Sequence, residues 1–342
     1  MIRILSLFSL LFLALACQSD LAEADSDALS IYDSFHQDLK SHYAGFANEH
    51  QADSLYYRLH KNLKANSSDA ELWQALCSYA DALNDEHIKL YRDAEEEIFI
   101  SGDEGFIASQ QAFSLELIAA DYLENAGLSG DMLLYGELSP KIAYLYVAAL
   151  LEEDEQYLIN ALEALDLDAK SALVIDLRQC IGGYDGLAAV FAAHFSRHQD
   201  LVFRSRIKSG PGAHQFSAAE DYNSPAPSSP HFAKPIVFLT DRGTVSEAEI
   251  LSLYLRSYDQ VHHIGDSTAG ALSMVSPARF LANGWRYEYS IQKILQPDGS
   301  SFEKLGIKPE INIKNNPSNI QSGKDLVLEG AIQFLTENYN IN

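Results

Sequence analysis

The feature that most constrains the fold is an apolar run followed at once by a polar glycine turn and a helix-forming run. Residues 235–239 read Pro-Ile-Val-Phe-Leu, and residues 240–250 read Thr-Asp-Arg-Gly-Thr-Val-Ser-Glu-Ala-Glu-Ile. The pattern predicts a buried strand and then a helix that begins near Ser246. A hydroxyl at a helix N-terminus is well placed to act as a nucleophile, because the helix dipole favours developing negative charge.

The same residues also fit a purely structural role. Serine is a preferred helix N-cap, and Glu247 and Glu249 would complement the dipole in the first turn. The turn alone therefore leaves both interpretations open, and the rest of the chain has to decide between them.

Composition narrows the class of protein. The 342 residues suffice for one large or two moderate domains, and 47% of them are hydrophobic, as in a packed globular protein. A net charge of −24 disfavours nucleic acids and anionic membrane surfaces as partners. Cys77 and Cys180 could form at most one disulfide, and we expect both to be free and buried. No cysteine cluster indicates a metal site.

The N-terminus has the pattern of a secretory signal. Residues 1–16 hold an apolar run that is too short to span a membrane. Cys17 follows Leu-Ala-Leu-Ala and resembles the lipidated cysteine of a bacterial lipobox, although Ala14 stands where leucine is usual. A cleaved signal without a lipid is the alternative. We expect an exported protein, a bacterial lipoprotein of the periplasm or outer membrane, in which residues 17–29 form an acidic tether.

The hydrophobic pattern changes along the chain. Residues 30–90 read as an N-terminal helical domain, with Phe35, Leu39 and Tyr43 on one face. Residues 91–137 form a connecting segment of mixed pattern, and residues 138–342 read as α/β. There we expect strands at 142–146, 172–177, 236–239 and 261–264, helices at 157–165, 187–195 and 325–335, a hairpin at 287–291 after Asn283-Gly284, and a long loop at 209–231.

Four further segments carry polar residues next to apolar runs. They are Leu-Asn-Asp-Glu-His at 83–87, Asp-Leu-Arg-Gln-Cys-Ile-Gly-Gly at 176–183, Gly-Asp-Ser-Thr-Ala-Gly at 265–270 and Glu-Lys-Leu-Gly-Ile-Lys-Pro at 303–309. With the Ser246 turn, and in this order, they resemble the C-terminal processing (tail-specific) serine peptidase family, in its tricorn-core and retinoid-binding-protein-like branch. The family's serine turn often reads Thr-Ala-Ser-Ala-Ser-Glu, which places the nucleophile at Ser246.

The resemblance implies a crotonase-like (ClpP-like) α/β core preceded by a small helical domain. It implies an endopeptidase that hydrolyses peptides or proteins through an acyl-enzyme, with Ser246 as nucleophile, His87 as base and Glu303 as the carboxylate that orients His87. The backbone N–H groups of Gly182, Gly183 and Glu247 would form the oxyanion hole. No metal or organic cofactor is implied.

The sequence departs from the family at several places. Many members use a Ser/Lys dyad, but Ala271 stands at the place of that lysine and the next lysine is Lys293. Cys180 replaces the usual asparagine before the paired glycines. The interval 88–135 is too short for a PDZ module, so the chain resembles a branch without one.

Other interpretations compete with this one. His87 could be a surface histidine at a helix end, Glu303 a solvated carboxylate, and His214 a rival base, although a substrate-lid role for its loop is more plausible. His262 and His263 fit packing and surface roles, and Cys180 lacks the histidine motif that a nucleophile needs. A non-catalytic protein that binds apolar ligands or peptides, a lipid-anchored scaffold and a serine esterase remain the alternative functions. The oligomeric state cannot be read from the sequence.

Overall fold

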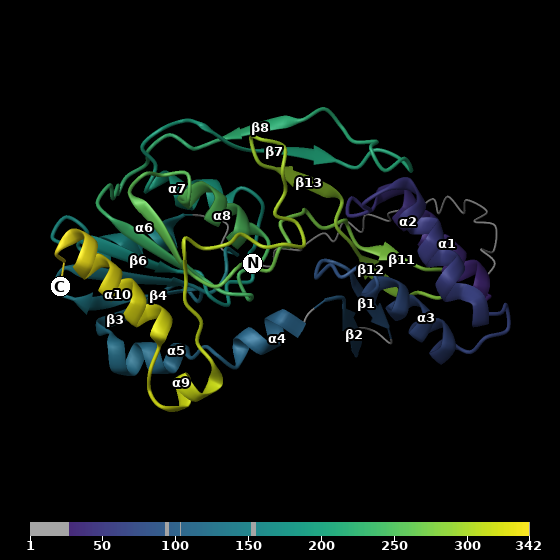
Figure 1. Ribbon diagram of the computed structural model, residues 1–342, viewed down its shortest axis with the longest axis horizontal. Coiled ribbons are helices and arrows are strands. Elements are labelled where there is room, and N and C mark those ends of the chain that lie inside the picture. The colour runs from purple at the N-terminus through teal and green to yellow at the C-terminus, as the bar shows by residue number, and fades with distance from the viewer. Residues whose placement is uncertain (1–26, 93–95, 103, 152–154, 342) are drawn as a thin grey trace, which may run out of the picture.

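The computed structural model describes residues 27–92, 96–102, 104–151 and 155–341. Its central feature is a seven-stranded sheet in the order β14-β10-β9-β6-β5-β4-β3 (Figure 1). Five neighbouring strands run parallel to one another and two more extend the sheet antiparallel. The parallel strands are β5 (Ile142–Val147), β6 (Ala172–Asp176), β9 (Ile236–Thr240), β10 (Val261–Gly265) and β14 (Ile311–Asn312), and the antiparallel strands are β3 (Glu124–Ser129) and β4 (Leu133–Ser139).

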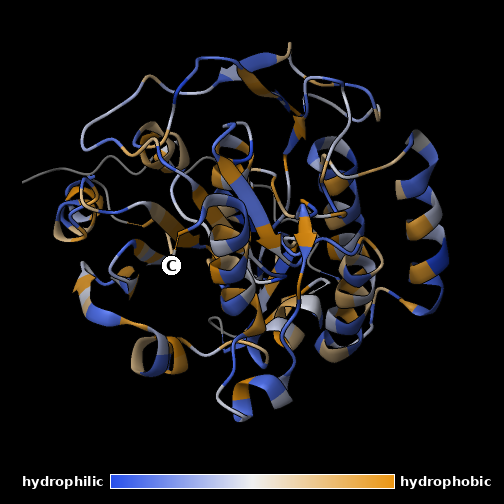
Figure 2. Cartoon of the chain, turned by 60° about the vertical axis from the view of Figure 1, so that its left-hand side comes forward, coloured by the Kyte–Doolittle hydropathy of each residue, from blue (hydrophilic) through white to orange (hydrophobic). Residues whose placement is uncertain are grey.

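Helices cover both faces of this sheet. On β6, Leu173 and Ile175 pack into a core shared with α6 (Gln156–Ala164), α7 (Leu187–Ala193) and α8 (Glu247–Leu255). The alternate residues Ala172 and Val174 pack into a second core, which includes α10 (Leu326–Tyr339). Burial on both faces is why these strands read as continuous apolar runs. The α/β class expected from the sequence is confirmed. The helices carry hydrophobic and hydrophilic residues side by side (Figure 2).

The N-terminal helices form a separate core at one end of the molecule (Figure 1). They are α1 (Ala28–His42), α2 (Glu49–Leu59), the short 3₁₀-helix η1 (His60–Asn62) and α3 (Asp69–Asp81). Asp27 caps α1 by accepting from Leu29 N and Ser30 N, and Ser68 and Glu71 form a capping box on α3. The helical region expected from the sequence is therefore present.

A small sheet joins these helices to residues from the far end of the chain. Its order is β11-β12-β1-β2, built from β1 (Lys89–Arg92), β2 (Glu97–Ile100), β11 (Arg279–Phe280) and β12 (Arg286–Glu288). Tyr287 of β12 packs its ring 5.0 Å from that of Phe35 on α1. The second core is thus made from two distant stretches of sequence.

The structure differs from the expectation between 200 and 295. β7 (Leu201–Ile207), β8 (Glu220–Asn223) and β13 (Gln292–Leu295) form a third sheet. Of its strands, β7 and β8 lie above α7 and α8 in Figure 1. The expected loop at 209–231 was wrong in one respect, because β8 lies within it and pairs with β7. A hairpin does form around Asn283-Gly284, between β11 and β12, but the expected strand at 287–291 ends at Glu288.

The interval with the mixed pattern supplies more regular structure than its sequence indicates. Besides β1 to β4 it holds the short elements α4 (Glu104–Gln110), α5 (Leu115–Leu117) and η3 (Ile118–Tyr122), and α9 (Pro317–Gln321) lies near the C-terminus. Tertiary contacts fix such short elements, so local periodicity does not predict them. The proposed division into domains stays a prediction.

The described residues bear on two expectations about the ends and the cysteines. Residues 1–26, with the expected signal segment and Cys17, lie outside them. Within them, no helix is both long and apolar enough to cross a bilayer. Cys77 and Cys180 are both free; Cys180 is fully buried and Cys77 partly so.

Candidate active site

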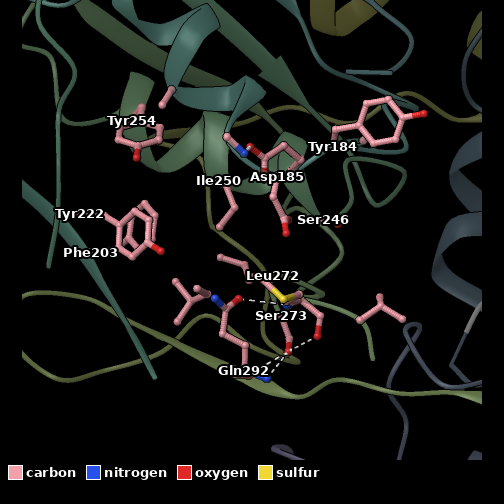
Figure 3. Close-up of a pocket in the computed structure, with 17 residues that line it drawn as sticks. Tyr184, Asp185, Phe203, Tyr222, Ser246, Ile250, Tyr254, Leu272, Ser273 and Gln292 are labelled. Atoms are coloured by element: carbon pink, nitrogen blue, oxygen red, sulfur yellow. Dashed lines mark hydrogen bonds between the residues drawn. The ribbon is translucent and has the colours of Figure 1, made fainter. Parts of the chain in front are cut away.

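Ser246 lies at the strained turn between β9 and α8. It is the N-cap residue of α8, with φ 59° and ψ −124°, in a region that residues other than glycine rarely occupy. Its hydroxyl makes no capping hydrogen bond. The side chain lines a pocket, as Figure 3 shows. The purely capping interpretation therefore has no support in the geometry.

Hydrogen bonds lock this turn to the turn that follows β6. Asp241 Oδ1 accepts from Gln179 N at 3.0 Å and from Gly243 N at 2.8 Å. Val245 N donates to Cys180 O at 3.0 Å. Because β6 and β9 are neighbouring parallel strands, both turns leave the same edge of the sheet.

The paired glycines approach the serine turn closely. A Cβ on Gly182 would lie 2.8 Å from both Ser246 Cβ and Glu247 N, and one on Gly183 would lie 1.8 Å from Leu150 O. Only glycine fits such contacts without a backbone shift. Among the described residues, the N–H groups of Gly183 and Glu247 have no hydrogen-bond acceptor.

Cys180 does not resemble a reactive thiol. Burial raises the pKa of its thiol to about 12, and a hydrogen bond from the Gly182 N–H offsets part of that rise. A thiol with so high a pKa holds almost no thiolate at neutral pH. The Gly182 N–H is therefore shared with this sulfur, whereas those of Gly183 and Glu247 are not.

His87 and Glu303 come together although 215 residues separate them in the sequence. An oxygen of Asp85, a ring nitrogen of His87 and an oxygen of Glu303 lie within 4.8 Å of one another. His87 is only 4% exposed, so it is not a surface histidine at a helix end. Asp85 Oδ1 accepts from His87 N at 2.9 Å, and His87 Nδ1 lies 3.5 Å from Ser290 Oγ.

The loop after β10 connects this cluster to the serine. Ser246 N donates to Ala271 O at 3.0 Å, and the next residue, Leu272, donates its N–H to Glu303 Oε2 at 3.1 Å. A single peptide unit, the one between Ala271 and Leu272, therefore holds both Ser246 and Glu303. The described residues show no hydrogen bond between Ser246 Oγ and the His87 ring, so that link stays a prediction.

Burial sets the charge states in the cluster. It lowers the pKa of His87 to about 4, against the opposing charge of Asp85. It also raises the pKa of Glu303 well above its usual value, with further increases from the charges of Asp85 and Glu249. Glu303 Oε1 is buried and has no hydrogen-bond partner in the described part of the chain. At neutral pH the imidazole is neutral, which is the form a general base requires.

Two carboxylates in this region were not singled out by the sequence analysis. Asp85 lies inside the 83–87 motif and accepts a hydrogen bond from Tyr43 OH at 2.9 Å. Glu249 is completely buried and accepts from Gly270 N at 2.8 Å, Ala271 N at 2.7 Å and the Thr268 hydroxyl. Glu249 thereby fixes the loop that contacts Ser246. The sequence signal that could have identified Glu249 is its position three residues after the serine.

The rival residues lie elsewhere. His214 is exposed and does not line the pocket beside Ser246. Lys293 places its ammonium 4.7 Å from the centre of the Phe216 ring, and Ala271 carries no ionisable group. His263 stacks on Phe238, with the ring centres 4.2 Å apart, which fits the expected packing role.

Asp85, His87 and Glu303 form the one group of described residues with the spacing to hold a metal ion. Both oxygens of Asp85 already accept hydrogen bonds, from His87 N and Ser290 Oγ on one side and from Tyr43 OH on the other. Asp85 thus serves to fix the turn that carries His87.

The pocket beside Ser246 has a volume of about 560 Å³. Phe203 and Tyr222 stack at 4.6 Å on one of its sides, near Tyr254 (Figure 3). Leu272, Ser273 and Gln292 lie below Ser246 in that view. A pocket of this size next to a strained serine can hold the side chain of a substrate.

Comparison with known proteins assigns the chain to a family. The model of peptidase family S41 matches residues 141–313, about half of the chain. The chain belongs to peptidase family S41. The match runs from the start of β5 to just beyond β14, and it includes both turns, Ser246 and Glu303. The family expected from the sequence is confirmed.

Individual relatives agree with the S41 assignment. The chain is 26% identical over 173 residues to the carboxy-terminal processing protease CtpB of Bacillus subtilis, which covers 51% of this chain and 34% of that protein. It is 26% identical over 179 residues to CtpA of the same species, with coverages of 52% and 36%. The chain thus matches about a third of the length of these curated relatives.

A solved structure extends the likeness to nearly the whole fold. A putative peptidase from Parabacteroides merdae superposes with a TM-score of 0.81 at 21% identity, covering 91% of this chain and 97% of that one. At this identity the superposition speaks for the fold alone. The fold shared with that protein therefore includes the N-terminal helices as well as the central sheet.

Proposed function

We propose that this S41 protein is a serine peptidase in which Ser246 is the nucleophile, His87 the base and Glu303 the group that orients His87. The observation that carries the proposal is the strained, uncapped Ser246, held between the glycine turn and the loop that binds Glu303. Backbone strain that the surroundings maintain is typical of functional positions.

In the proposed reaction, Ser246 Oγ attacks the carbonyl carbon of the scissile bond as its proton passes to His87. The negative charge on the carbonyl oxygen is stabilised by the N–H groups of Gly183 and Glu247, which have no other acceptor among the described residues, and by that of Gly182. His87 then gives the proton to the leaving amine, and an acyl-enzyme on Ser246 remains. Water deprotonated by His87 releases the second product and restores the serine.

For this chemistry to occur, His87 and Ser246 must come within hydrogen-bond distance of each other. No hydrogen bond joins it to Ser246 in the described residues, and catalytic hydrogen bonds often tighten only when substrate is bound. Glu303, whose pKa is raised by burial and by the charges of Asp85 and Glu249, would be the carboxyl group that orients the His87 ring. A serine esterase would use the same three residues, and peptides are the substrates that the family favours.

A fluorophosphonate probe tests the proposal. The protein truncated after Cys17 should be labelled, and labelling should be lost in both Ser246→Ala and His87→Ala. Ser257→Ala, at the opposite end of α8 and exposed, is the control and should keep full labelling. Absence of labelling in the folded wild type would contradict the proposed triad and direct attention to ligand binding.

We also propose that the protein is exported and anchored through a lipid on Cys17. The support is the apolar segment 4–15 followed by the small residues before that cysteine. Radiolabelled palmitate should be incorporated by the wild type and not by Cys17→Ser. Incorporation by neither protein would contradict lipidation of Cys17.

A further inference from the structure

The pocket beside Ser246 carries negative charge and no positive charge. Asp185 and Glu247 both line it, and no lysine, arginine or histidine is among its lining residues in the described chain. Glu247 is only 6% exposed, so most of its side chain is out of contact with bulk water. A concave site with one sign of charge concentrates ligands of the opposite sign.

Hydrogen bonds fix the Glu247 carboxylate through one of its two oxygens. Oε1 accepts from Gly186 N and from Ala188 N, each at 2.9 Å. Oε2 has no hydrogen-bond partner among the described residues. Burial raises the pKa of Glu247 to about 7, and the charge of Asp185 adds to that rise. The carboxylate is therefore held in place with one oxygen still able to bind a donor.

Aromatic rings surround the same space. The stacked rings of Phe203 and Tyr222 are 11° from parallel, and Tyr254 lies edge-on to Phe203 at 5.6 Å. Burial raises the pKa values of Tyr222 and Tyr254, and the charge of Glu247 raises them further. Glu247 lines the same pocket as these two tyrosines. Ring faces beside a carboxylate suit a cation on a long aliphatic stem.

The unpaired oxygen discriminates between occupants. A purely apolar side chain would exclude water from Glu247 Oε2 and offer no hydrogen bond in return, which is unfavourable for a carboxylate. A lysine or arginine side chain would pair with Oε2 and lay its methylene groups along the rings. The aromatic walls alone would accept either an apolar or a basic side chain, so the carboxylate determines which of the two the pocket prefers.

The position of the pocket shows which part of a peptide it would hold. Gly183 and Glu247 line it and offer the free N–H groups that would bind the carbonyl oxygen. His87, which must reach the leaving amine, does not line it. The pocket therefore lies on the acyl side of the scissile bond.

We propose that this pocket selects a lysine or arginine as the residue that supplies the scissile carbonyl, and that Glu247 is the group that pairs with it. The inference rests on the proposed peptidase function. The resembling family's serine turn often has alanine directly after the nucleophile, where this chain has Glu247, so the specificity would belong to this chain.

Peptidyl diphenyl phosphonates test the inference, because they modify an active serine at a rate set by the side chain in this pocket. Four probes would carry lysine, arginine, norleucine or phenylalanine at the reactive residue. Norleucine matches the lysine stem without its ammonium. We expect the wild type to react at least tenfold faster with the lysine probe than with the norleucine probe. That preference should grow between pH 6 and pH 8 as Glu247 ionises.

The decisive variant is Glu247→Gln, which keeps an oxygen for the two N–H groups but removes the charge. The ratio of its rate with the lysine probe to its rate with the norleucine probe should fall at least tenfold, and this ratio is the readout. Glu337→Gln, an exposed change on α10, is the matched control and should keep the wild-type preference. Equal losses with all four probes would show that Glu247 only supports the fold, and would overturn the inference.

A preference of the wild type for norleucine or phenylalanine would also overturn it. The general fluorophosphonate separates the two levels of the argument. If it labels Ser246 but the basic probes have no advantage, the specificity inference fails and the peptidase proposal stands. If it labels nothing in the folded protein, the proposed function itself fails.

Discussion

At the scale of single residues, the positive φ of Ser246 is strain that only its surroundings maintain. Its N–H is bound to Ala271 O, and Gly182 packs against its Cβ. The sequence indicated this residue through the strand, turn and helix pattern, and it indicated His87 and Glu303 through their motifs. It did not indicate that Asp85 would join them, because that contact exists only in the folded chain.

The strain at Ser246 predicts that a glycine variant at this position is more stable than an alanine variant, which is the reverse of the usual order. Glycine adopts φ 59° freely, so Ser246→Gly should be more stable than Ser246→Ala by about 1 kcal/mol. Both variants lack the hydroxyl and should be inactive. Urea unfolding of the two variants measures the difference. Equal stability, or a more stable alanine variant, would mean that the turn relaxes in solution.

Buried His87 predicts a loss of stability in acid. Its pKa is lowered from 6.5, the ordinary value of histidine, to about 4 in the folded protein, so between these pH values the unfolded chain binds more protons. Stability should therefore fall as pH decreases from about 6.5 to 4, by about 3 kcal/mol from this group. His87→Gln should flatten that part of the curve of unfolding free energy against pH. An unchanged slope in the variant would show that other groups cause it.

At the scale of elements, the loop after β10 depends on α8 for its shape. Glu249 in the first turn of α8 accepts hydrogen bonds from the N–H groups of Gly270 and Ala271, and the next peptide unit holds both Ser246 and Glu303. The sequence predicted α8 and β10 correctly. The conformation of the loop between them could not be predicted, because a buried side chain and not a local turn signal determines it.

Removal of Glu249 should damage both stability and activity. In Glu249→Ala two buried N–H groups lose their acceptor, which should cost about 3 kcal/mol of unfolding free energy. The displaced loop should also slow labelling of Ser246 by more than tenfold. Glu337→Ala, a change at an exposed residue of α10, is the control. Normal labelling in Glu249→Ala would show that the loop keeps its shape without the carboxylate.

The glycine turn after β6 should tolerate no side chain at its second glycine. A Cβ on Gly183 would meet Leu150 O at 1.8 Å, so Gly183→Ala should destabilise the protein by about 3 kcal/mol or more. At Gly186 nothing lies within 4 Å, and its φ of +90° makes Gly186→Ala costly by only about 1 kcal/mol. Thermal unfolding compares the two, and equal effects would contradict the close approach.

At the scale of the whole molecule, a buried ionic group fastens the C-terminal helix to the sheet. Arg178 after β6 contacts Asp176 at 2.6 Å and both oxygens of Asp325 at 2.9 Å, and all three are almost fully buried. Asp325 also caps α10 through Leu328 N. The sequence showed Arg178 and Asp325 each next to an apolar run. It did not show that these two residues, 147 positions apart, would pair.

Because this ionic group is buried, a conservative substitution in it should destabilise the fold strongly. Asp325→Asn keeps an acceptor for the helix cap but leaves Arg178 with a single charged partner, so it should destabilise the fold by about 3 to 5 kcal/mol. Asp221→Asn removes the exposed partner of Arg204 and should cost less than about 1 kcal/mol. Urea unfolding measures both, and similar values would show that Arg178 finds another partner.

The sequence by itself determined the α/β class, the order of the main strands and helices, and the turns that carry Ser246 and the paired glycines. These follow from local periodicity and from motifs within a few residues. Only the tertiary structure decided that β12 would join the N-terminal helices, that β8 would arise within an expected loop, and that Glu247 would line the pocket. Such features depend on contacts between residues that are far apart in the sequence. The energies of these contacts cannot be inferred from any short stretch of the chain.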